Sequence, residues 1–503
     1  MVIPRHSPFG EPKQRLKNSL CVAIALMLGA CAVGPDFSRP AAPTMAAYVA
    51  SDERQPDDSD RQRATLGRRI IGEWWTLYRS DDLDRLIKEA IAGNRDLAAA
   101  RASLTQAAQE ARAAGAALYP QADLAASAER NRINYVSTGI QAPNTVFNLY
   151  QVGPTVSYAL DLFGKVHRQV EEANARAEMT AYQLDGAYLS LTGNVVTQVL
   201  TIASLRAQIR ATQDIINDDV RNLDLIRRGK DAGVATEVDV RHADSQLAGD
   251  RTLLPPLHQQ LSAARHALAV LIGREPASWS PPDFELSAFH LHDDLPLSLP
   301  SALVRQRPDI LAAEADLHAA AAEVGVATAN MYPQITLFAD VAQAATVPAH
   351  LFSAAANGNA IGAALTAPLF HGGALSASKA AAQGAYQASC ARYEQTVLLS
   401  FAQVADVLQA LQHDAEETDA QEKALAAAEA SLRFTRAGFG VGSVGVLQVL
   451  DAQRQYQQAL LGAVRARAQH LMDTAQLFLA MGGGWWEWDG RAGAMPVTPG
   501  AAQ

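Results

Sequence analysis

The 503-residue sequence predicts a mainly helical protein that also supplies strands to a membrane β-barrel. Three observations support this fold class. Hydrophobic residues make up 49% of the chain and aromatic residues only 6%, a composition typical of closely packed, alanine-rich helices. The second half of the chain repeats the first at a spacing of about 210 residues, which predicts two tandem structural repeats. Each repeat contains one very long helix-forming stretch and two strand-forming stretches.

The first 30 residues have the anatomy of a secretory signal peptide. Basic residues precede an apolar segment at 20–30, and Cys31 directly follows Leu28-Gly29-Ala30. This ending resembles the bacterial lipobox, in which the first mature cysteine receives lipid. We therefore expect Cys31 to be acylated and to anchor the chain, and Ala32 favours the outer membrane over the inner one. The alternative is an ordinary cleaved signal in which Cys31 is incidental.

Composition excludes several other classes of protein. Beyond the signal no window reaches about 18 consecutive apolar residues, so a membrane pore must be built from strands. A net charge of −10 argues against nucleic acid as a partner. After export Cys390 has no cysteine to pair with. The sequence has no HExxH motif, no Walker loop, no nucleophile elbow and no paired-cysteine zinc spacing that would indicate an enzyme, and no cofactor is expected.

The internal repeat sets the domain boundaries. Tyr119-Pro120-Gln121 recurs as Tyr332-Pro333-Gln334, and further matches follow in the same order. The predicted segments are a signal peptide at 1–30, a lipid-anchored tether at 31–73, a first repeat at 74–278, a linker at 279–299, a second repeat at 300–484 and a C-terminal tail at 485–503.

Each repeat opens with a helix and continues with two strands. The helices are predicted at 81–118 and 300–330, and each ends at a Tyr-Pro pair because proline disfavours helical geometry in the residue before it. The predicted strands are 121–132, 146–160, 334–343 and 360–368. Pro154 weakens the second strand, and Asn357-Gly358-Asn359 is expected in a loop.

The strands have the length and pattern of a barrel wall. Apolar and polar residues alternate in part along 334–341, which suits a wall with lipid on one side and water on the other. Four strands of about ten residues can cross an outer membrane, but a closed barrel needs at least about eight. Several copies of the chain must therefore pool their strands: two copies give eight and three give twelve.

Long helices follow the strands and end in glycine-marked turns. The stretches 165–228 and 376–437 would each extend roughly 95 Å and carry apolar seams for neighbouring helices. Returning helices are expected to begin near Thr236 and Ser443. The glycines that permit these tight reversals are Gly229, Gly233, Gly438, Gly440 and Gly442.

Motifs spread over nearly all of the mature chain resemble one family, the TolC-like outer membrane efflux proteins, and within it the NodT-type lipoprotein branch. They include Trp75-Thr76-Leu77-Tyr78, Asp161-Leu162-Phe163-Gly164, Arg307-Pro308-Asp309-Ile310, Leu450-Asp451-Ala452-Gln453 and Gly482-Gly483-Gly484-Trp485. The resemblance implies a homotrimer with a shared 12-stranded β-barrel in the outer membrane and a trimeric α-barrel of long helices in the periplasm. It also implies docking onto a periplasmic adaptor and an inner-membrane pump.

The resemblance further implies a gate near the second glycine turn. Leu447 and Asp451 match the apolar and acidic rings that narrow the periplasmic mouth of related ducts, and residues four apart share one helix face. The alternative is that Leu447 packs between helices and Asp451 is a solvated charge. The first repeat has Val238 and His242 at these positions. The glycine turns are expected to contact the adaptor.

The expected function is a passive, gated exit duct for drugs and toxic metabolites. The alternatives are a duct for type I-like protein secretion, a periplasmic coiled-coil scaffold without a pore and, least favoured, an exported enzyme. Two motifs are interpreted as accidental. Gly440-x-Gly442-x-x-Gly445 has the dinucleotide spacing but follows a helix, and His290-x-His292 lies in the linker.

Overall fold

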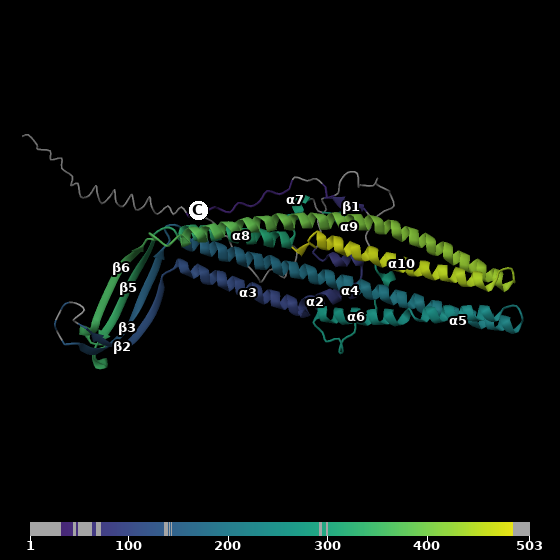
Figure 1. Ribbon diagram of the computed structural model, residues 1–503, viewed down its shortest axis with the longest axis horizontal. Coiled ribbons are helices and arrows are strands. Elements are labelled where there is room, and N and C mark those ends of the chain that lie inside the picture. Colours follow the sequence, from purple (N-terminus) through teal and green to yellow (C-terminus); the bar gives the residue numbers. More distant parts are fainter. Residues whose placement is uncertain are drawn as a thin grey trace, which may run out of the picture. The chain divides into compact units, whose positions relative to one another are not determined.

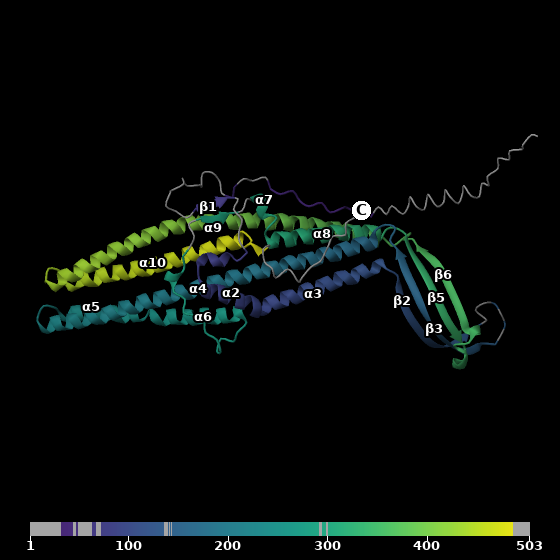
Figure 2. The same cartoon turned by 180° about the vertical axis from the view of Figure 1, so that it is seen from behind.

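A computed structural model of the chain describes residues 32–43, 47–48, 63–66, 72–134, 139, 141, 143–290, 294–297 and 300–485. Figures 1 and 2 show it from opposite sides. The chain divides into two compact units, and each draws on both halves of the sequence. The sheet unit comprises Met1–Arg39, Thr105–Met179 and Ala313–Tyr393, and the turn unit comprises Pro40–Leu104, Thr180–Ala312 and Glu394–Gln503.

The sheet unit contains one four-stranded antiparallel sheet in the order β2-β3-β5-β6 (Figure 1). Its strands are β2 (Gln121–Ile133), β3 (Thr145–Leu160), β5 (Gln334–Ala345) and β6 (Asn357–Thr366). All four lie close to their predicted positions. The expected loop at Asn357-Gly358-Asn359 is wrong, because these residues begin β6 and pair with β5.

The two faces of this sheet differ in polarity. Residues directly opposite one another on neighbouring strands share a face, so the register assigns every side chain to one of the two faces of the sheet. One face carries mostly apolar residues, among them Leu124, Val156, Tyr158, Ile335, Leu337, Val341, Ile361 and Leu365. The other carries mostly polar or small residues, among them Gln121, Asp123, Ser127, Thr155, Ser157, Thr336, Asp340 and Gly362. Large apolar side chains stay uncovered, with Ile361 88% exposed.

Pro154 lies inside β3 and not at its end. It pairs with Leu124 on the β2 side, but the register toward β5 is interrupted at Gly153 and Pro154. Proline has no N–H group to donate, so an interruption on one side is the form in which a strand tolerates it. At Gly153 a Cβ atom would lie 1.9 Å from the carbonyl oxygen of Val341, so only glycine fits this close approach.

The opening helices of both repeats are broken, in contrast to the prediction. The first divides into α2 (Asp81–Gly93) and α3 (Arg95–Gly115) because the Asn94 side chain accepts a hydrogen bond from the Leu97 amide at 2.8 Å. The second divides into α7 (Pro300–Leu303) and α8 (Pro308–Ala329), where proline occupies the first position of the new helix.

The long helices α4 (Lys165–Asp231) and α9 (Ala374–Gly440) have 67 residues each and extend roughly 100 Å. Each ends three residues beyond its predicted limit. In α4 one 18-residue window is apolar enough to cross a membrane, but 67% of that window is buried, as expected for a helix in a protein core. The returning helices are α5 (Glu237–Arg251), α6 (Leu254–Ile272) and α10 (Val446–Ala480).

An aromatic core holds the turn unit together. Trp74 stacks on Phe478 at 5.4 Å between ring centroids, and the Tyr78 hydroxyl donates a hydrogen bond to the Leu471 carbonyl at 2.7 Å. Arg307 donates to the Ala480 carbonyl at 2.9 Å and pairs with Asp309. Several of the motifs that resemble the efflux family therefore join the first and second halves of the chain.

One short two-stranded sheet was not predicted from the sequence. Strand β1 (Arg63–Leu66) pairs in parallel with β4 (Asp294–Leu297), and so joins the expected tether to the expected linker. Four-residue strands without a clear alternation are weak signals in a sequence.

Candidate gate and helix turns

The first glycine turn connects α4 to α5 in the turn unit. Gly233 has a φ of +79°, and the amides of Val234 and Ala235 both donate to the Gly229 carbonyl, at 2.8 and 3.2 Å. Thr236 then caps α5. Its hydroxyl accepts from the Asp239 amide, and its own amide donates to the Asp239 carboxylate at 2.8 Å.

The second turn connects α9 to α10 by a similar arrangement. Gly442 has a φ of +75°, and the Ser443 amide donates to the Gly438 carbonyl at 3.0 Å. A Cβ atom on Gly438 would lie 2.7 Å from Val444, whereas one on Gly440 would meet nothing within 4 Å. Gly442 and Gly438 are therefore required by the turn, and Gly440 is the last residue of a regular helix.

Both turns present apolar side chains outward. Val234 and Val441 are each 81% exposed. Behind them a single apolar cluster packs the two helical hairpins together. Its members are Ile216, Leu223, Ile226, Val240, Ala243, Leu247 and Val446, with Phe439 and Leu450 against its side. Apolar packing thus fixes the helices next to the turns, whereas the turn residues themselves are exposed.

The predicted gate residues lie on the outward face of α10. Val446, Val449 and Ala452 are buried, whereas Leu447 is 57% exposed. Asp451 is also exposed and accepts hydrogen bonds from Arg454 at 2.5 Å and Gln455 at 2.9 Å on the same helix. Leu447 therefore does not pack between helices of its own chain. The first-repeat counterparts Val238 and His242 are likewise exposed.

A buried polar network behind α10 escaped the sequence analysis. Asp219 of α4 is 3% exposed and lies beside Asp250 of α5. Gln453 donates to Asp219, and Gln457 donates to Asp250 at 2.8 Å. Burial, followed by the neighbouring Asp250 carboxylate, raises the pKa of Asp219 to about 8. At neutral pH this site therefore holds a proton, which allows the two carboxyl groups to share a hydrogen bond.

An ion pair also links the two hairpins near this network. Arg436 of α9 contacts Asp218 of α4 at 2.9 Å, and Asp218 additionally pairs with Arg221. Asp218 and Arg436 have opposite effects on the pKa of Asp219, because the Asp218 charge raises it and the Arg436 charge lowers it.

In the sheet unit, residues 32–39 form an extended strap along the helices. The Val33 amide donates to the Phe163 carbonyl at 3.2 Å, Asp36 pairs with Arg168 at 2.5 Å, and Phe37 stacks on His318 at 4.3 Å. Gly34 crosses α8 at Gly325, where a Cβ atom would lie 2.5 Å from the Gly325 Cα. Cys31, the predicted acylation site, lies outside the described residues.

Of the two motifs that were interpreted as accidental, the glycine motif is described in full and the histidine motif only in part. Gly440 to Gly445 lies between two helices and not after a strand. His290 contacts the Ala288 carbonyl at 3.0 Å, and residues 291–293 lie outside the described residues. Among described residues no group of three or more His, Cys, Asp or Glu side chains could hold a metal ion.

A sheet with one apolar and one polar face, continued by helices of roughly 100 Å, is typical of an outer-membrane channel subunit. The comparisons with known proteins agree. The family model for outer membrane efflux protein matches residues 86–274 and 299–483, so the chain belongs to the outer membrane efflux protein family. This is a family of transport channels and not of enzymes.

Individual relatives match along nearly their whole length. The pyoverdine export outer membrane protein OpmQ of Pseudomonas aeruginosa is 29% identical over 478 residues, which cover 93% of this chain and 97% of OpmQ. The probable efflux pump outer membrane protein TtgC of Pseudomonas putida is 30% identical over 484 residues, covering 95% and 97%. The solved outer-membrane channel OprN superposes with a TM-score of 0.82 at 27% identity, covering 90% of this chain and all of OprN.

Proposed function

We propose that three copies of this outer-membrane efflux component form a passive, gated exit duct for small molecules. Work is supplied by an inner-membrane pump, and a periplasmic adaptor connects the pump to the duct. The export of pyoverdine by OpmQ, as its name states, supports a small-molecule cargo.

The two-faced sheet with open edges carries this proposal. β2 has 13 residues and pairs only with β3, and β6 has 10 residues and pairs only with β5 in the described part of the chain. Unpaired backbone groups are not tolerated in hydrocarbon. Joining the β2 edge of one copy to the β6 edge of the next satisfies them, and three copies supply twelve strands around a polar lumen.

In this duct Leu447 and Asp451 form the resting gate. Their exposure on a helix whose opposite face is buried supports this role. Repeated in three copies, Leu447 gives an apolar collar that favours dewetting, and Asp451 gives a carboxylate collar that repels anions. Opening requires the collars to separate.

The glycine turns are the sites for the adaptor. Val234 and Val441 offer exposed apolar contacts. At Gly233, Gly440 and Gly442 a Cβ atom would meet nothing within 4 Å, so a partner can approach the backbone there. Gly229 and Gly438 belong to the same turns and make room for Val234 and Val444 of this chain. Contact at both turns would act on the helices that carry the gate.

Cys31 is the lipid anchor, which holds the start of the mature chain at the inner surface of the outer membrane. The hydrogen bond of the Val33 amide to the Phe163 carbonyl supports this assignment, because it holds the residues next to Cys31 close to the end of β3.

A matched pair of substitutions tests the lipid-facing and water-facing sides of the sheet. Ile361 and Ala360 are neighbours in β6 on opposite faces, both exposed. Ile361→Lys places a charge toward lipid at a cost of about 2–4 kcal/mol near the bilayer centre, and should reduce the yield of heat-modifiable trimer. Ala360→Lys faces water opposite Asp340, and should assemble and shift the ion selectivity of channels in planar bilayers.

Equal yields of the two variants would contradict the assignment of faces. An unsubstituted protein that assembles but conducts no ions would instead favour the non-pore scaffold. A protein that stays monomeric in detergent would exclude the duct.

A further inference from the structure

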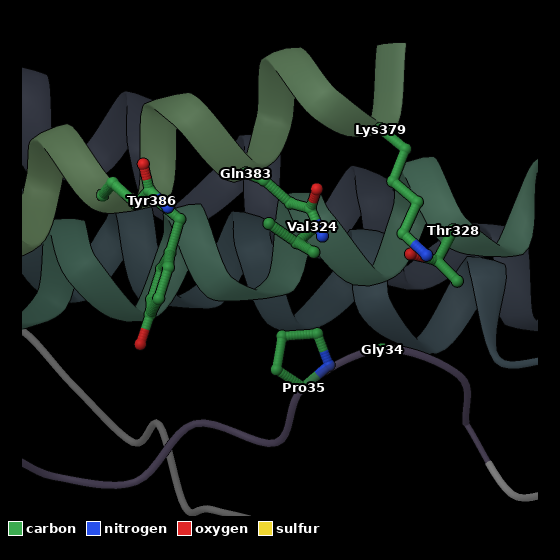
Figure 3. A pocket seen from close by; sticks show the side chains of 8 residues that line it. Gly34, Pro35, Val324, Thr328, Lys379, Gln383 and Tyr386 are labelled. Atoms are coloured by element: carbon green, nitrogen blue, oxygen red, sulfur yellow. The ribbon is translucent and has the colours of Figure 1, made fainter. Parts of the chain in front are cut away.

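A pocket in the sheet unit contains a buried hydroxyl without a hydrogen-bond partner and a lysine without an ion-pair partner among the described residues. It is a cavity of about 550 Å³ between the strap, α8 and α9, within the size range of small-molecule sites. Figure 3 shows Lys379 and Gln383 on α9, Thr328 and Val324 on α8, and Gly34 with Pro35 on the strap. Tyr386 and Gln387 complete the lining.

The most buried polar group in this pocket is unsatisfied. Thr328 is 9% exposed, and its hydroxyl has no hydrogen-bond partner among the described residues. A threonine within a helix ordinarily bonds a carbonyl of the preceding turn, and leaving a buried hydroxyl unpaired costs free energy. We therefore expect the hydroxyl to form a hydrogen bond with a group of a ligand that enters the pocket.

Lys379 adds an uncompensated positive charge. Within the described part of the chain, Lys88, Lys230 and Lys423 pair with carboxylates in the turn unit, whereas Lys379 and Lys165 have no ion-pair partner. Both of these lysines belong to the sheet unit. In Figure 3 the Lys379 side chain reaches from α9 toward Thr328. Together they offer an ammonium group and a hydroxyl to one anion.

The pocket lies close to where the sheet begins. Thr328 precedes the first residue of β5 by six positions, and Lys379 is in the second turn of the helix that follows β6. Lys165 is the first residue of the helix that follows β3. If the sheet crosses the membrane, as proposed above, these lysines lie at the membrane surface, where basic residues attract anionic headgroups.

We propose that this pocket binds the phosphate group of a glycerophospholipid from the membrane leaflet adjoining the helices. Lys379 and the Thr328 hydroxyl hold the phosphate oxygens, and the amides of Gln383 and Gln387 donate to the remaining headgroup oxygens. Pro35 and Val324 cover the glycerol carbons. The strap thereby becomes one wall of a lipid site in addition to its contacts with α4 and α8.

Lipid binding to the full-length protein can be measured by native mass spectrometry in detergent. The probe is dioctanoyl phosphatidylglycerol, with dioctanoylglycerol as the lipid without phosphate and inorganic phosphate as the free anion. Lys379→Ala should weaken binding of the phospholipid by about tenfold, and Thr328→Val by about threefold. Lys379→Arg should retain most of the affinity, because it retains the charge. Lys423→Ala, which removes an exposed lysine of the turn unit, is the matched control and should have no effect.

Three results would overturn the proposal. The first is equal binding of the two lipids, and the second is displacement of the phospholipid by an equal concentration of inorganic phosphate. The third is a loss of trimer in Lys379→Ala with unchanged lipid affinity, which would make the pocket a contact between subunits. Channel conductance measured on the same preparations tests the proposed duct separately, because binding in detergent does not require a working pore.

Discussion

Leu447 and Asp451 are the residues through which α10 is expected to limit permeation. Replacing both, Leu447→Ser with Asp451→Ala, should raise single-channel conductance severalfold, because it removes the apolar and acidic collars together. The measurement is conductance in planar bilayers, supported by antibiotic uptake in cells. The matched control is Val238→Ser with His242→Ala at the corresponding, equally exposed positions of the first repeat. Unchanged conductance in a correctly assembled trimer would refute the gate assignment.

The raised pKa of Asp219 predicts that the stability of the protein depends on pH. Its pKa is raised to about 8 in the folded chain from an ordinary value of 3.8, so the folded state binds a proton that the unfolded state releases. The resulting stability is complete below about pH 4 and is lost as the pH rises to about 8. The midpoint temperature of thermal unfolding should therefore fall by several degrees between pH 5 and pH 8.5.

Asp219→Asn should remove most of this pH dependence, because an amide replaces the protonated acid beside Asp250. Asp218→Asn changes the neighbouring carboxylate, which pairs with arginines, and should leave the dependence in place. An unaltered slope in Asp219→Asn would show that other groups set the response.

Sequence reasoning at the scale of residues succeeded where the cause is local. Gly233 and Gly442 have the positive φ that a helix reversal needs, as their sequence context predicted. It could not find the Asp219 network, because Gln453 is 234 positions away in the chain. Nothing in the local sequence distinguishes Asp219 from a solvated helix charge.

Among the elements, β3 offers the sharpest test because Gly153 closely approaches β5. Gly153→Ala would place a Cβ atom 1.9 Å from the Val341 carbonyl oxygen, so the strands must separate locally. Trimer stability, measured as the temperature of dissociation, should fall by an amount equivalent to roughly 1–3 kcal/mol.

Gly358→Ala in β6 is the matched control. There the added Cβ atom would make an ordinary contact of 3.8 Å with Ala342, and little change is expected. Equal losses for the two variants would indicate that strand glycines matter through backbone entropy and not through close approach.

The extended strands and long helices were predictable because their patterns persist over many residues. All four long strands and both 67-residue helices lie within a few residues of expectation. The exceptions depend on tertiary contacts. The break at Asn94 is held by its bond to the Leu271 carbonyl at 2.9 Å, and the pairing of β1 with β4 joins segments more than 200 residues apart.

For the molecule as a whole, lipid attachment can be tested without disturbing the fold. Cys31→Ser should abolish labelling by radioactive palmitate, because the acyl chains are expected at this thiol. Cys390→Ser, which changes a free and partly buried cysteine in α9, is the control and should label normally. Label that persists in Cys31→Ser would mean that acylation occurs elsewhere.

The two open edges of the sheet have a genetic consequence. In the proposed ring of three, each copy would use its β2 edge on one neighbour and its β6 edge on the other, so a single copy with a faulty edge would leave the barrel open. A cell that makes equal amounts of normal and edge-defective protein would complete only about one ring in eight from normal copies alone. Alleles whose products have a damaged β2 or β6 but still associate with normal subunits should thus be dominant. Alleles whose products cannot associate at all should be recessive.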